Sequence, residues 1–466
     1  MNNKESNENL LEKIQSLAKR RGFIYQGSEI YGGLTGTWDY GPLGTLLKNN
    51  IRDSWIDYFV KSKDNMYLID TPILMHPRVW EASGHTNEFI DPLVDDLVTK
   101  KRYRADHLLE EADIDTEHMT VDEMGIKIKE LGLKSPEGNA ISEVRKFNLM
   151  LGTKMGAVEE TAVNTYLRPE EAQSMFVGFK NIMDSFSPKF PFGIAQIGKA
   201  FRNEITPRDF TYRMREFEIM EFEYFIKPDA PWEAFFDNFL TQQKEWLSII
   251  GVDVSKIHPL EHPETARAHY SKKTIDLEFE YPFGIKELTG LSHRGDFDLT
   301  RHQEFSGQTM SVLDEETKER FIPHVIEPTV SVDRALLALL VSSYREEQKE
   351  DDVRVYLKFP PAIAPYKCAV SPLLKNKPEL VTKARMVYDM LKEEFGWVAW
   401  DDNGNIGKRY RRQDEIGTPW CIVIDFDTLG EGGEGMKDTV TIRDRDTGNQ
   451  ERVAIADLIS KIKEQL

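Results

Sequence analysis

The chain has 466 residues, more than a single hydrophobic core usually serves, so two or three domains are expected. Its formal net charge of −19 argues against a protein that coats nucleic acid through overall charge, although local basic patches can still hold RNA. With 40% hydrophobic and 30% charged residues and no long apolar run, the composition predicts a soluble protein without a membrane span. The polar segment 1–10 has the layout of neither a secretory signal nor a transit peptide, which predicts a cytoplasmic location.

Hydrophobic periodicity and turn residues predict the elements of the first part of the chain. Residues 10–21 carry apolar positions at helical spacing and predict an amphipathic helix. The stretch 30–44, rich in glycine and aromatics, predicts a loop in which backbone segments approach closely. A helix at about 43–62 and a strand at 66–72 follow. Residues 91–146, dense in Asp, Glu and Lys, are interpreted as an insertion that could form a small helical module.

The middle of the chain is expected to contain antiparallel strands. Alternating segments at 195–203 and 216–226, separated by a polar turn at 205–209, predict a hairpin. The other elements expected here are strands at 275–281 and 285–292, a helix at 231–250 and a buried helix at 330–345.

The proline-rich run Phe359–Pro365 is expected to separate two domains. Strand and helix patterns alternate beyond it, which predicts a small α/β domain with a mixed or parallel sheet. The expected strands lie at 366–370, 397–400 and 420–425, and the expected helices at 379–395 and 409–416.

The predicted hairpin carries side chains suited to a nucleoside triphosphate. One strand ends in Phe201-Arg202-Asn203-Glu204, and the other begins with Arg213-Met214-Arg215-Glu216-Phe217. Guanidinium groups form charge-assisted, often bidentate bonds to phosphate oxygens, and an aromatic ring can stack on a base. An arbitrary hairpin of this kind is more often a surface element with paired charges, so the interpretation depends on the rest of the chain.

Three segments, in order, resemble the signature motifs of class II aminoacyl-tRNA synthetases. Residues 43–72 resemble the first motif, a long helix and a strand ending in proline that builds the dimer interface in that family. Residues 201–217 resemble the second motif, and Val325-Ile326-Glu327-Pro328-Thr329-Val330-Ser331-Val332-Asp333-Arg334 resembles the third. The resemblance implies an α+β catalytic domain with an antiparallel sheet, and a homodimer.

Blocks along nearly the whole chain are similar to the dimeric glycyl-tRNA synthetases, among them Trp38–Gly44, Glu81–His85 and Tyr166–Glu170. The segment Gly407–Trp420 resembles the anticodon-binding domain that this family shares with prolyl, threonyl and histidyl enzymes. The resemblance implies a catalytic domain at 1–358, interrupted by the insertion at about 91–146, and a C-terminal α/β anticodon-binding domain at 359–466. It also implies an enzyme that activates glycine with ATP and Mg²⁺ and transfers the glycyl group to the 3′ end of tRNA(Gly).

The resemblance further implies how ATP is held. Arg202 would bind the α-phosphate, Glu204 the adenine edge or another part of ATP, and Arg334 the γ-phosphate, and these three are the expected catalytic residues. Phe217 would stack on adenine, and Glu287 is a candidate magnesium ligand. The full set expected to bind ATP is Arg202, Asn203, Glu204, Tyr212, Arg213, Met214, Arg215, Glu216, Phe217, Glu287, Leu288, Ser331, Val332, Asp333 and Arg334.

Glycine offers only an ammonium and a carboxylate, so its site must grip both ends and leave no room for a β-carbon. By the resemblance, Glu221 and Glu327 face the ammonium with Thr329 beside it, and Arg294 binds the carboxylate. Two carboxylates around an empty cation site repel each other, so the pKa of one should rise. The full set expected at glycine is Arg104, Glu170, Phe217, Glu218, Glu221, Arg294, Glu327, Thr329 and Ser331.

Two positions of the third motif depart from the family's pattern. Thr329 stands where the family more often has serine, and Ser331 where it usually has glycine, whose missing side chain lets backbone approach a ligand. The segment 95–100 also lacks the cysteine pair that some relatives carry. Because Cys368 and Cys421 are too few and too far apart for a disulfide framework or a four-thiolate site, we expect no zinc and reduced thiols.

Basic residues around Tyr410 fit RNA recognition, in which aromatic and arginine side chains stack on unpaired bases and contact phosphates. Lys408, Arg409, Arg411 and Arg412 are therefore expected to contact tRNA. A solvated helix face is the alternative interpretation of the same run.

Other functions stay open at this point. The nearest is a sister class II synthetase of seryl or prolyl specificity, and another is an ATP-dependent ligase with a different acceptor. A third is a non-catalytic, synthetase-like nucleic-acid-binding subunit, since one scaffold can serve several functions. A retired active site would be expected to have lost several of Arg202, Glu204, Glu221, Glu327 and Arg334, all of which are present here.

Overall fold

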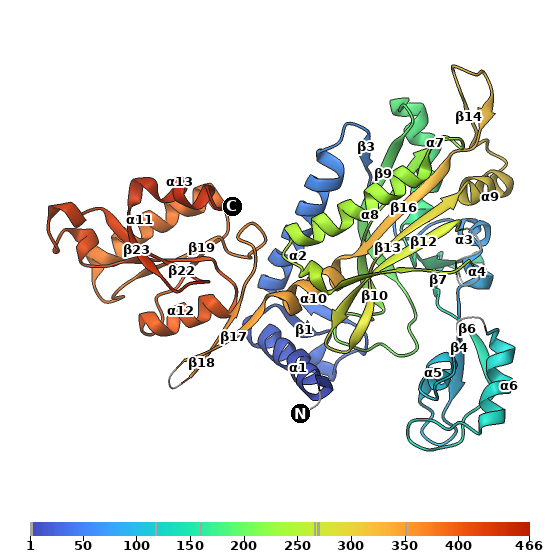
Figure 1. Cartoon of the computed structure of the whole chain (residues 1–466), viewed down its shortest axis with the longest axis horizontal. Coiled ribbons are helices and arrows are strands. Elements are labelled where there is room, and N and C mark those ends of the chain that lie inside the picture. The colour runs from blue at the N-terminus through green and yellow to red at the C-terminus, as the bar shows by residue number, and fades with distance from the viewer. Residues whose placement is uncertain (1–2, 117–118, 159–160, 265–266, 268–270, 350–351) are drawn as a thin grey trace.

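The computed structural model describes residues 3–466 except 117–118, 159–160, 265–266, 268–270 and 350–351. Its largest sheet has seven strands and runs through the centre of the larger body (Figure 1). All neighbouring pairs are antiparallel except β3, which pairs in parallel with β9. The strand order is β11 (Ile257–Glu261), β12 (Lys273–Tyr281), β13 (Gly284–Gly295), β16 (His324–Ser331), β10 (Glu216–Ile226), β9 (Phe192–Phe201) and β3 (Met66–Leu68).

The expected hairpin is confirmed as the pair β9 and β10, in which Glu216 lies opposite Phe201. Strand β10 has the predicted bounds, whereas β9 starts at residue 192 rather than 195, because residues 192–194 are also buried in the sheet, and ends at residue 201. The strands expected at 275–281 and 285–292 are confirmed as β12 and β13.

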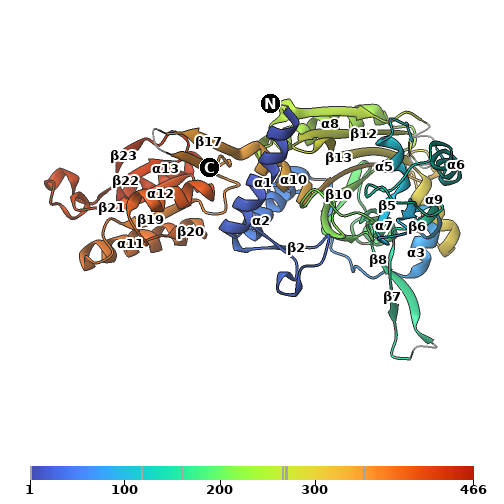
Figure 2. The same ribbon diagram turned by 90° about the horizontal axis from the view of Figure 1, so that it is seen from below.

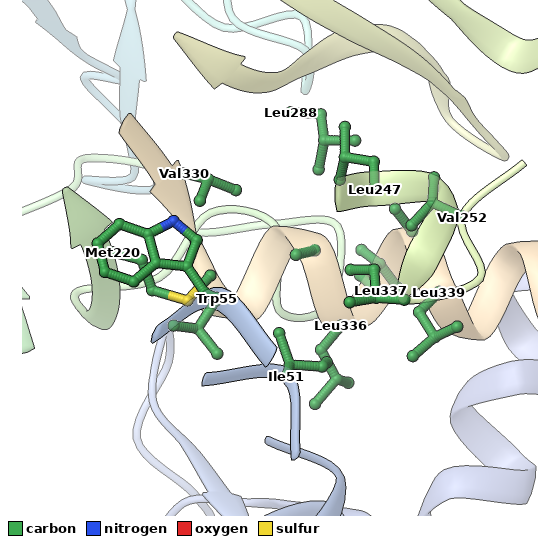
Figure 3. Close-up of a cluster of buried hydrophobic side chains, with 14 of the residues drawn as sticks. Ile51, Trp55, Met220, Leu247, Val252, Leu288, Val330, Leu336, Leu337 and Leu339 are labelled. Carbon is green, nitrogen blue, oxygen red and sulfur yellow. The ribbon is translucent and has the colours of Figure 1, made fainter. Parts of the chain in front are cut away.

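Helices on one face of the sheet enclose the main hydrophobic core. They are α1 (Asn3–Arg21), α2 (Pro42–Ile56) with a π-helical turn at Asp57–Lys61, α8 (Trp232–Ile249) and α10 (Val332–Ser343). In Figure 3, Ile51 and Trp55 of α2 lie near Leu336 of α10 and Met220 of β10. Helix α2 begins with a proline, which needs no hydrogen-bond acceptor there.

The buried helix expected at 330–345 begins later than predicted. Val330 and Ser331 belong to strand β16, and α10 starts at Val332. The Ser331 hydroxyl accepts a hydrogen bond from the Arg334 backbone N–H at 3.4 Å and caps the helix. Tyr344 then begins β17 (Tyr344–Gln348), which pairs with β18 (Val353–Leu357). An apolar run by itself did not distinguish the strand end from the helix.

The insertion is not a purely helical module. Strands β4 (Ile90–Asp95), β5 (Arg102–Arg104) and β6 (Arg145–Asn148) form a sheet packed against α5 (Ala105–Glu110) and α6 (Val121–Leu131). The short strands were missed because each needs its partners to form. This module lies beside the main body (Figure 1), and the hairpin of β7 (Leu151–Met155) and β8 (Val163–Leu167) projects from that body in Figure 2.

Further elements complete the larger body. They are β1 (Ile24–Gln26), β2 (Trp38–Tyr40), α3 (Pro77–Ala82), α4 (His85–Glu88), α7 (Ala172–Phe186), α9 (Phe297–Ser306), β14 (Val312–Leu313) and β15 (Arg320–Phe321).

The C-terminal residues form a second sheet with its own hydrophobic core (Figure 1). Strands β20 (Val398–Trp400), β19 (Cys368–Pro372) and β21 (Trp420–Ile424) are parallel, whereas β22 (Thr439–Asp444) and β23 (Gln450–Ala454) are antiparallel. The predicted mixed sheet is confirmed. Its helices are α11 (Pro378–Phe395), α12 (Ile406–Glu415) and α13 (Leu458–Lys463), of which α13 was not predicted, and neither were β22 and β23. Among the described helices, none is long and apolar enough to cross a membrane.

Candidate active site

A cavity opens on the sheet where β10, β13 and β16 meet the turn between β9 and β10. Most of the residues expected at ATP line it, so the tertiary structure brings them together from four segments of the chain. The lining residues are Arg202, Glu204, Tyr212, Arg213, Met214, Phe217, Ile219, Glu287, Leu288, Thr329, Ser331 and Arg334.

Arg202 lies over the ring of Phe217, with its guanidinium carbon 5.3 Å from the ring centre. It lies equally far from Phe89, and its Nε donates to the carbonyl of Pro169 at 3.2 Å. A guanidinium placed between two rings is held flat without using all of its donors. The remaining donors are suited to an anion in the cavity.

Arg334 lies on the other side of the same cavity. Its guanidinium is 4.5 Å from the ring centre of Tyr212, and its Nη1 lies 2.9 Å from Glu287 Oε2. Arg334, and more weakly Arg202, lowers the pKa of Glu287 against the opposing effect of burial. Glu287 is therefore held ionised and offers carboxylate oxygens of the kind that Mg²⁺ prefers.

A second, acidic cluster lies next to the cavity along the same strands. The hydroxyl of Thr329 donates to Glu221 Oε1 at 2.6 Å. Burial and then repulsion by Glu327 raise the pKa of Glu221 well above its ordinary value. Burial also raises the pKa of Glu327, although Arg294 opposes that effect. The expected rise in pKa at this pair is present in the structure.

Arg294 holds Glu327 rather than facing the cavity. Its Nε and Nη2 donate to Asp298 at 2.7 and 2.9 Å, and its Nη1 donates to Glu327 at 2.9 Å. All three side chains are buried, with Arg294 only 2% exposed. Asp298 was missed from the sequence, although it stands four residues after Arg294 at the start of α9. Arg294 thus positions the acidic cluster.

Glu170 lies close to the same cluster. Its carboxylate lies 3.2 Å from His85 Nε2 and accepts a hydrogen bond from Gln173 at 3.0 Å. Burial raises the pKa of Glu170, but His85 and Arg294 outweigh that effect, so the net shift is downward. Glu170 is therefore an ionised carboxylate, whereas the neighbouring Glu221 and Glu327 favour their protonated form.

Strand alternation places Glu218 and Glu216 away from these groups, contrary to the expectation for their side chains. Glu218 lies on the other face of β10, where it pairs with Lys48 at 2.5 Å and Arg52 at 3.0 Å. Glu216 forms an exposed ion pair with Lys199. Because the side-chain period of a strand is two, residues 217, 219 and 221 share the cavity face and residues 216 and 218 do not.

Asp333 and Val332 also lie outside the cavity. Asp333 accepts hydrogen bonds from the Tyr40 hydroxyl and, at 2.7 Å, from the backbone N–H of Glu218. Val332 is fully buried in the main core. These two residues hold the beginning of α10 against α2 and β10, which places Arg334 in the cavity.

Three more of the residues expected at the site form bonds with other parts of the protein. Arg215 donates to backbone carbonyls of Thr35 at 2.6 Å and Glu204 at 3.2 Å. The backbone N–H of Asn203 donates to Leu149. Arg104, in the insertion, is paired with Asp106 and Asp91. The side chains of Arg215 and Arg104 therefore have structural partners, and none of the three residues is among those that line the cavity.

The basic run on α12 is largely used within the fold. Arg409 is 3% exposed and donates to backbone carbonyls, including that of Pro372 at 2.5 Å. Arg412 pairs with Asp401 at 2.7 Å, and Arg411 pairs with Asp352. Lys408 is exposed on the first turn of α12. Of the four residues expected to contact tRNA, Arg409 and Arg412 therefore have structural roles.

Two family models match parts of the chain. Residues 157–344 match the model described as tRNA synthetase class II core domain (G, H, P, S and T), and residues 367–465 match the model described as anticodon binding domain.

Curated relatives match over nearly their full length. The chain is 46% identical over 458 residues to a glycine–tRNA ligase of Bacillus cereus, covering 96% of this chain and 97% of the relative. It is also 46% identical to glycine–tRNA ligases of Geobacillus kaustophilus and Clostridium kluyveri, with 98% of this chain and 99% of each relative covered.

A solved structure shares the fold at low sequence identity. Giardia lamblia prolyl-tRNA synthetase in complex with prolyl-adenylate matches with a TM-score of 0.66 and 15% identity, covering 98% of this chain and 75% of that chain.

Proposed function

This chain belongs to the glycine–tRNA ligase family, and we propose that it joins glycine to tRNA(Gly) through an adenylate formed in the cavity between Arg202 and Arg334. The glycine carboxylate attacks the α-phosphorus of ATP, pyrophosphate leaves, and the glycyl group then passes to a hydroxyl at the 3′ end of the tRNA. This assignment rests on the position of Thr329. Thr329 lines the cavity, and its hydroxyl donates a hydrogen bond to Glu221 of the adjoining acidic cluster.

The two arginines of the cavity act on the phosphates. Arg202, which lies over the ring of Phe217, would bind the α-phosphate, and the Phe217 ring would stack on adenine. Arg334, which lies over the ring of Tyr212, would bind the γ-phosphate. Such fixed positive charges stabilise the negative charge that develops during in-line attack without reorganising. No protein nucleophile is needed.

Glu287 is the candidate ligand for a magnesium ion that enters with ATP. It lines the cavity and is held ionised, so its chemistry fits that ion, and binding would exchange its ion pair with Arg334 for one with the metal. A bound magnesium ion would neutralise phosphate charge and orient the phosphates.

The acidic cluster recognises the amino group of glycine. Glu221 and Glu327 supply carboxylate oxygens to the ammonium, and Glu170 adds a further negative charge. Arg294 contributes by holding Glu327, and we assign the glycine carboxylate to Arg202, one of the arginines that line the cavity. Larger amino acids are excluded by overlap with this filled, buried site.

We further propose the organisation that the sequence suggested, with a catalytic domain at 1–358 and an anticodon-binding domain at 359–466. The separate hydrophobic cores and the residues matched by the two family models support this division. A homodimer through residues 43–72 is likewise proposed, supported by β3, which is an edge strand of the main sheet. Light scattering at micromolar concentration tests the dimer, and a monomer would contradict it. A cytoplasmic location stays a prediction from the sequence.

The proposed chemistry is tested by ATP–pyrophosphate exchange with the full-length protein. Exchange should depend on glycine, and Arg202→Ala should abolish it. Arg345→Ala, which removes an exposed arginine of β17, is the matched control and should leave exchange unchanged. Equal stimulation by alanine or serine would refute the glycine specificity, and full exchange in the Arg202 variant would refute the assigned phosphate site.

A further inference from the structure

The segment Arg168–Glu171 follows strand β8 and contacts both parts of the candidate active site. The carbonyl of Pro169 accepts a hydrogen bond from Arg202 Nε at 3.2 Å, on the side of the ATP cavity. The carboxylate of the next residue, Glu170, lies beside the acidic cluster, where its charge acts on Glu327. Two consecutive residues therefore place one group for each substrate.

Arg168 bonds this segment to the main sheet and to the chain that follows β3. Its Nε donates to the carbonyl of Lys199 on β9 at 2.8 Å, and its Nη1 donates to the carbonyl and the hydroxyl of Thr71, each at 3.1 Å. Its Nη2 lies 3.0 Å from Glu171 Oε1. The carbonyl of Arg168 accepts from the backbone N–H of Phe201 at 2.8 Å. Because Arg168 is only 2% exposed, little water competes for these bonds.

Gly198 on β9 leaves the space that the end of the Arg168 side chain occupies. A β-carbon on this glycine would overlap both Arg168 Nη2 and Glu171 Oε1. The Arg168 side chain is not free to move aside, because all three nitrogens of its guanidinium already have partners in fixed directions. The backbone of residues 169 and 170 therefore continues from an anchored position.

This backbone position matters for the orientation of Arg202. The rings of Phe89 and Phe217 hold its guanidinium flat but do not prevent it from turning within its own plane. The hydrogen bond from Nε to the Pro169 carbonyl restricts that rotation, so a shift of the carbonyl would turn the remaining donors of Arg202 away from the cavity.

We propose that Arg168 is a positioning residue for both substrates: it anchors residues 169 and 170, so that Pro169 orients Arg202 toward ATP and Glu170 faces the glycine ammonium. The proposal rests on the proposed function, in which Arg202 binds the α-phosphate and Glu170 adds negative charge at the ammonium. All of these contacts form within the protein, so both groups are oriented before the substrates bind, and binding does not have to order them.

Arg168→Lys tests this role because it keeps the positive charge and loses the guanidinium fork. One ammonium group cannot reproduce the bonds to Lys199, Thr71 and Glu171 together. In ATP–pyrophosphate exchange with the full-length protein, the KM for glycine and the KM for ATP should each rise about tenfold or more, because each substrate loses an oriented charged group. Arg345→Lys, at an exposed arginine of β17, is the matched control and should leave both KM values unchanged.

The joint rise distinguishes positioning from a purely structural role. If Arg168 only stabilised the fold, Arg168→Lys would melt at a lower temperature while both KM values stayed within about twofold of wild type, and this result would overturn the proposal. A rise in only one of the two KM values would also overturn it, because one anchor would then not serve both groups.

Gly198→Ala disturbs the same anchor without changing Arg168, and it decides if Arg168→Lys does not fold. The added β-carbon displaces the Arg168 side chain, so both KM values should again rise together. Gly152→Ala is its matched control, since the nearest atom to a β-carbon at this glycine of β7 is 3.8 Å away. Wild-type KM values in the Gly198 variant would refute the proposal. Failure of the proposed function would appear separately, as wild-type exchange that does not depend on glycine.

Discussion

Asp414 on α12 holds two arginines that reach it from other parts of the chain, and Asp414→Asn removes that anchor without changing its shape. Arg354 of β18 donates to Asp414 at 2.8 Å, and Arg443 of β22 donates at 2.8 and 3.1 Å. Asp414 is 2% exposed, and the two arginine side chains are 10% and 9% exposed. Removing one partner of a buried ion pair costs roughly 3–5 kcal/mol, because the other charge is left buried.

That loss should be visible as a large shift in calorimetry of the full-length protein. For a unit of about 100 residues, each kcal/mol lowers the melting temperature by roughly 4 °C or more, so the transition that involves the C-terminal sheet should fall by roughly 12 °C or more. Glycine-dependent exchange should persist while tRNA charging declines, since the catalytic cavity does not include Asp414.

Asp352→Asn is the matched control. Asp352 pairs with Arg411 of the same basic run, but the two side chains are 53% and 48% exposed. An exposed pair contributes about 0–1 kcal/mol, so this variant should melt within a few degrees of wild type. If the Asp414 variant melted at the temperature of this control, the view of α12 as a structural anchor would be refuted.

Three further outcomes are expected. Arg334→Lys should raise the KM for ATP about tenfold or more with little change in the KM for glycine, because an ammonium does not reproduce the guanidinium fork; an unchanged KM for ATP would contradict its phosphate role. Burial lowers the pKa of His293 to about 4, below that of a histidine in the unfolded chain. The neutral imidazole of His293 therefore contributes fully to the free energy of unfolding above about pH 6.5, and this contribution is lost as the pH falls toward 4. His293→Phe should therefore flatten this acid loss in urea unfolding at pH 7 and pH 5, and an unaltered loss would refute the assignment. Lys408→Ala should weaken tRNA binding without affecting stability, whereas Arg412→Ala, which breaks the pair with Asp401, should lower stability; the reverse pattern in binding and melting experiments would contradict the structural role.

Much of the main sheet was predictable because its signals are local. Alternation along 216–226 and the polar turn before it were sufficient to predict the hairpin of β9 and β10. The short strands of the insertion were not, since three or four residues carry little pattern and form only when their partners are present. The start of α10 was also misplaced, because Val330 and Ser331 are as compatible with a helix as with a strand until β16 is paired.

The candidate site, too, could be predicted from the sequence only in part. Arg202, Phe217, Glu287 and Arg334 were expected together and do line one cavity. Other candidates were named from motif position, which does not specify what a side chain contacts. Whether such a residue faces substrate or protein depends on groups far away in the sequence.

The amino-acid sequence by itself determined the order of the motifs, the antiparallel sheet and the mixed C-terminal sheet, and it predicted the residues proposed to bind ATP and glycine. Only the tertiary structure decided that Arg294 holds Glu327, that Glu218 faces α2, and that Arg409 supports its own domain. The reason is physical: motif and periodicity are properties of neighbouring residues, whereas the partner of a buried charge is set by long-range packing that brings distant segments into contact.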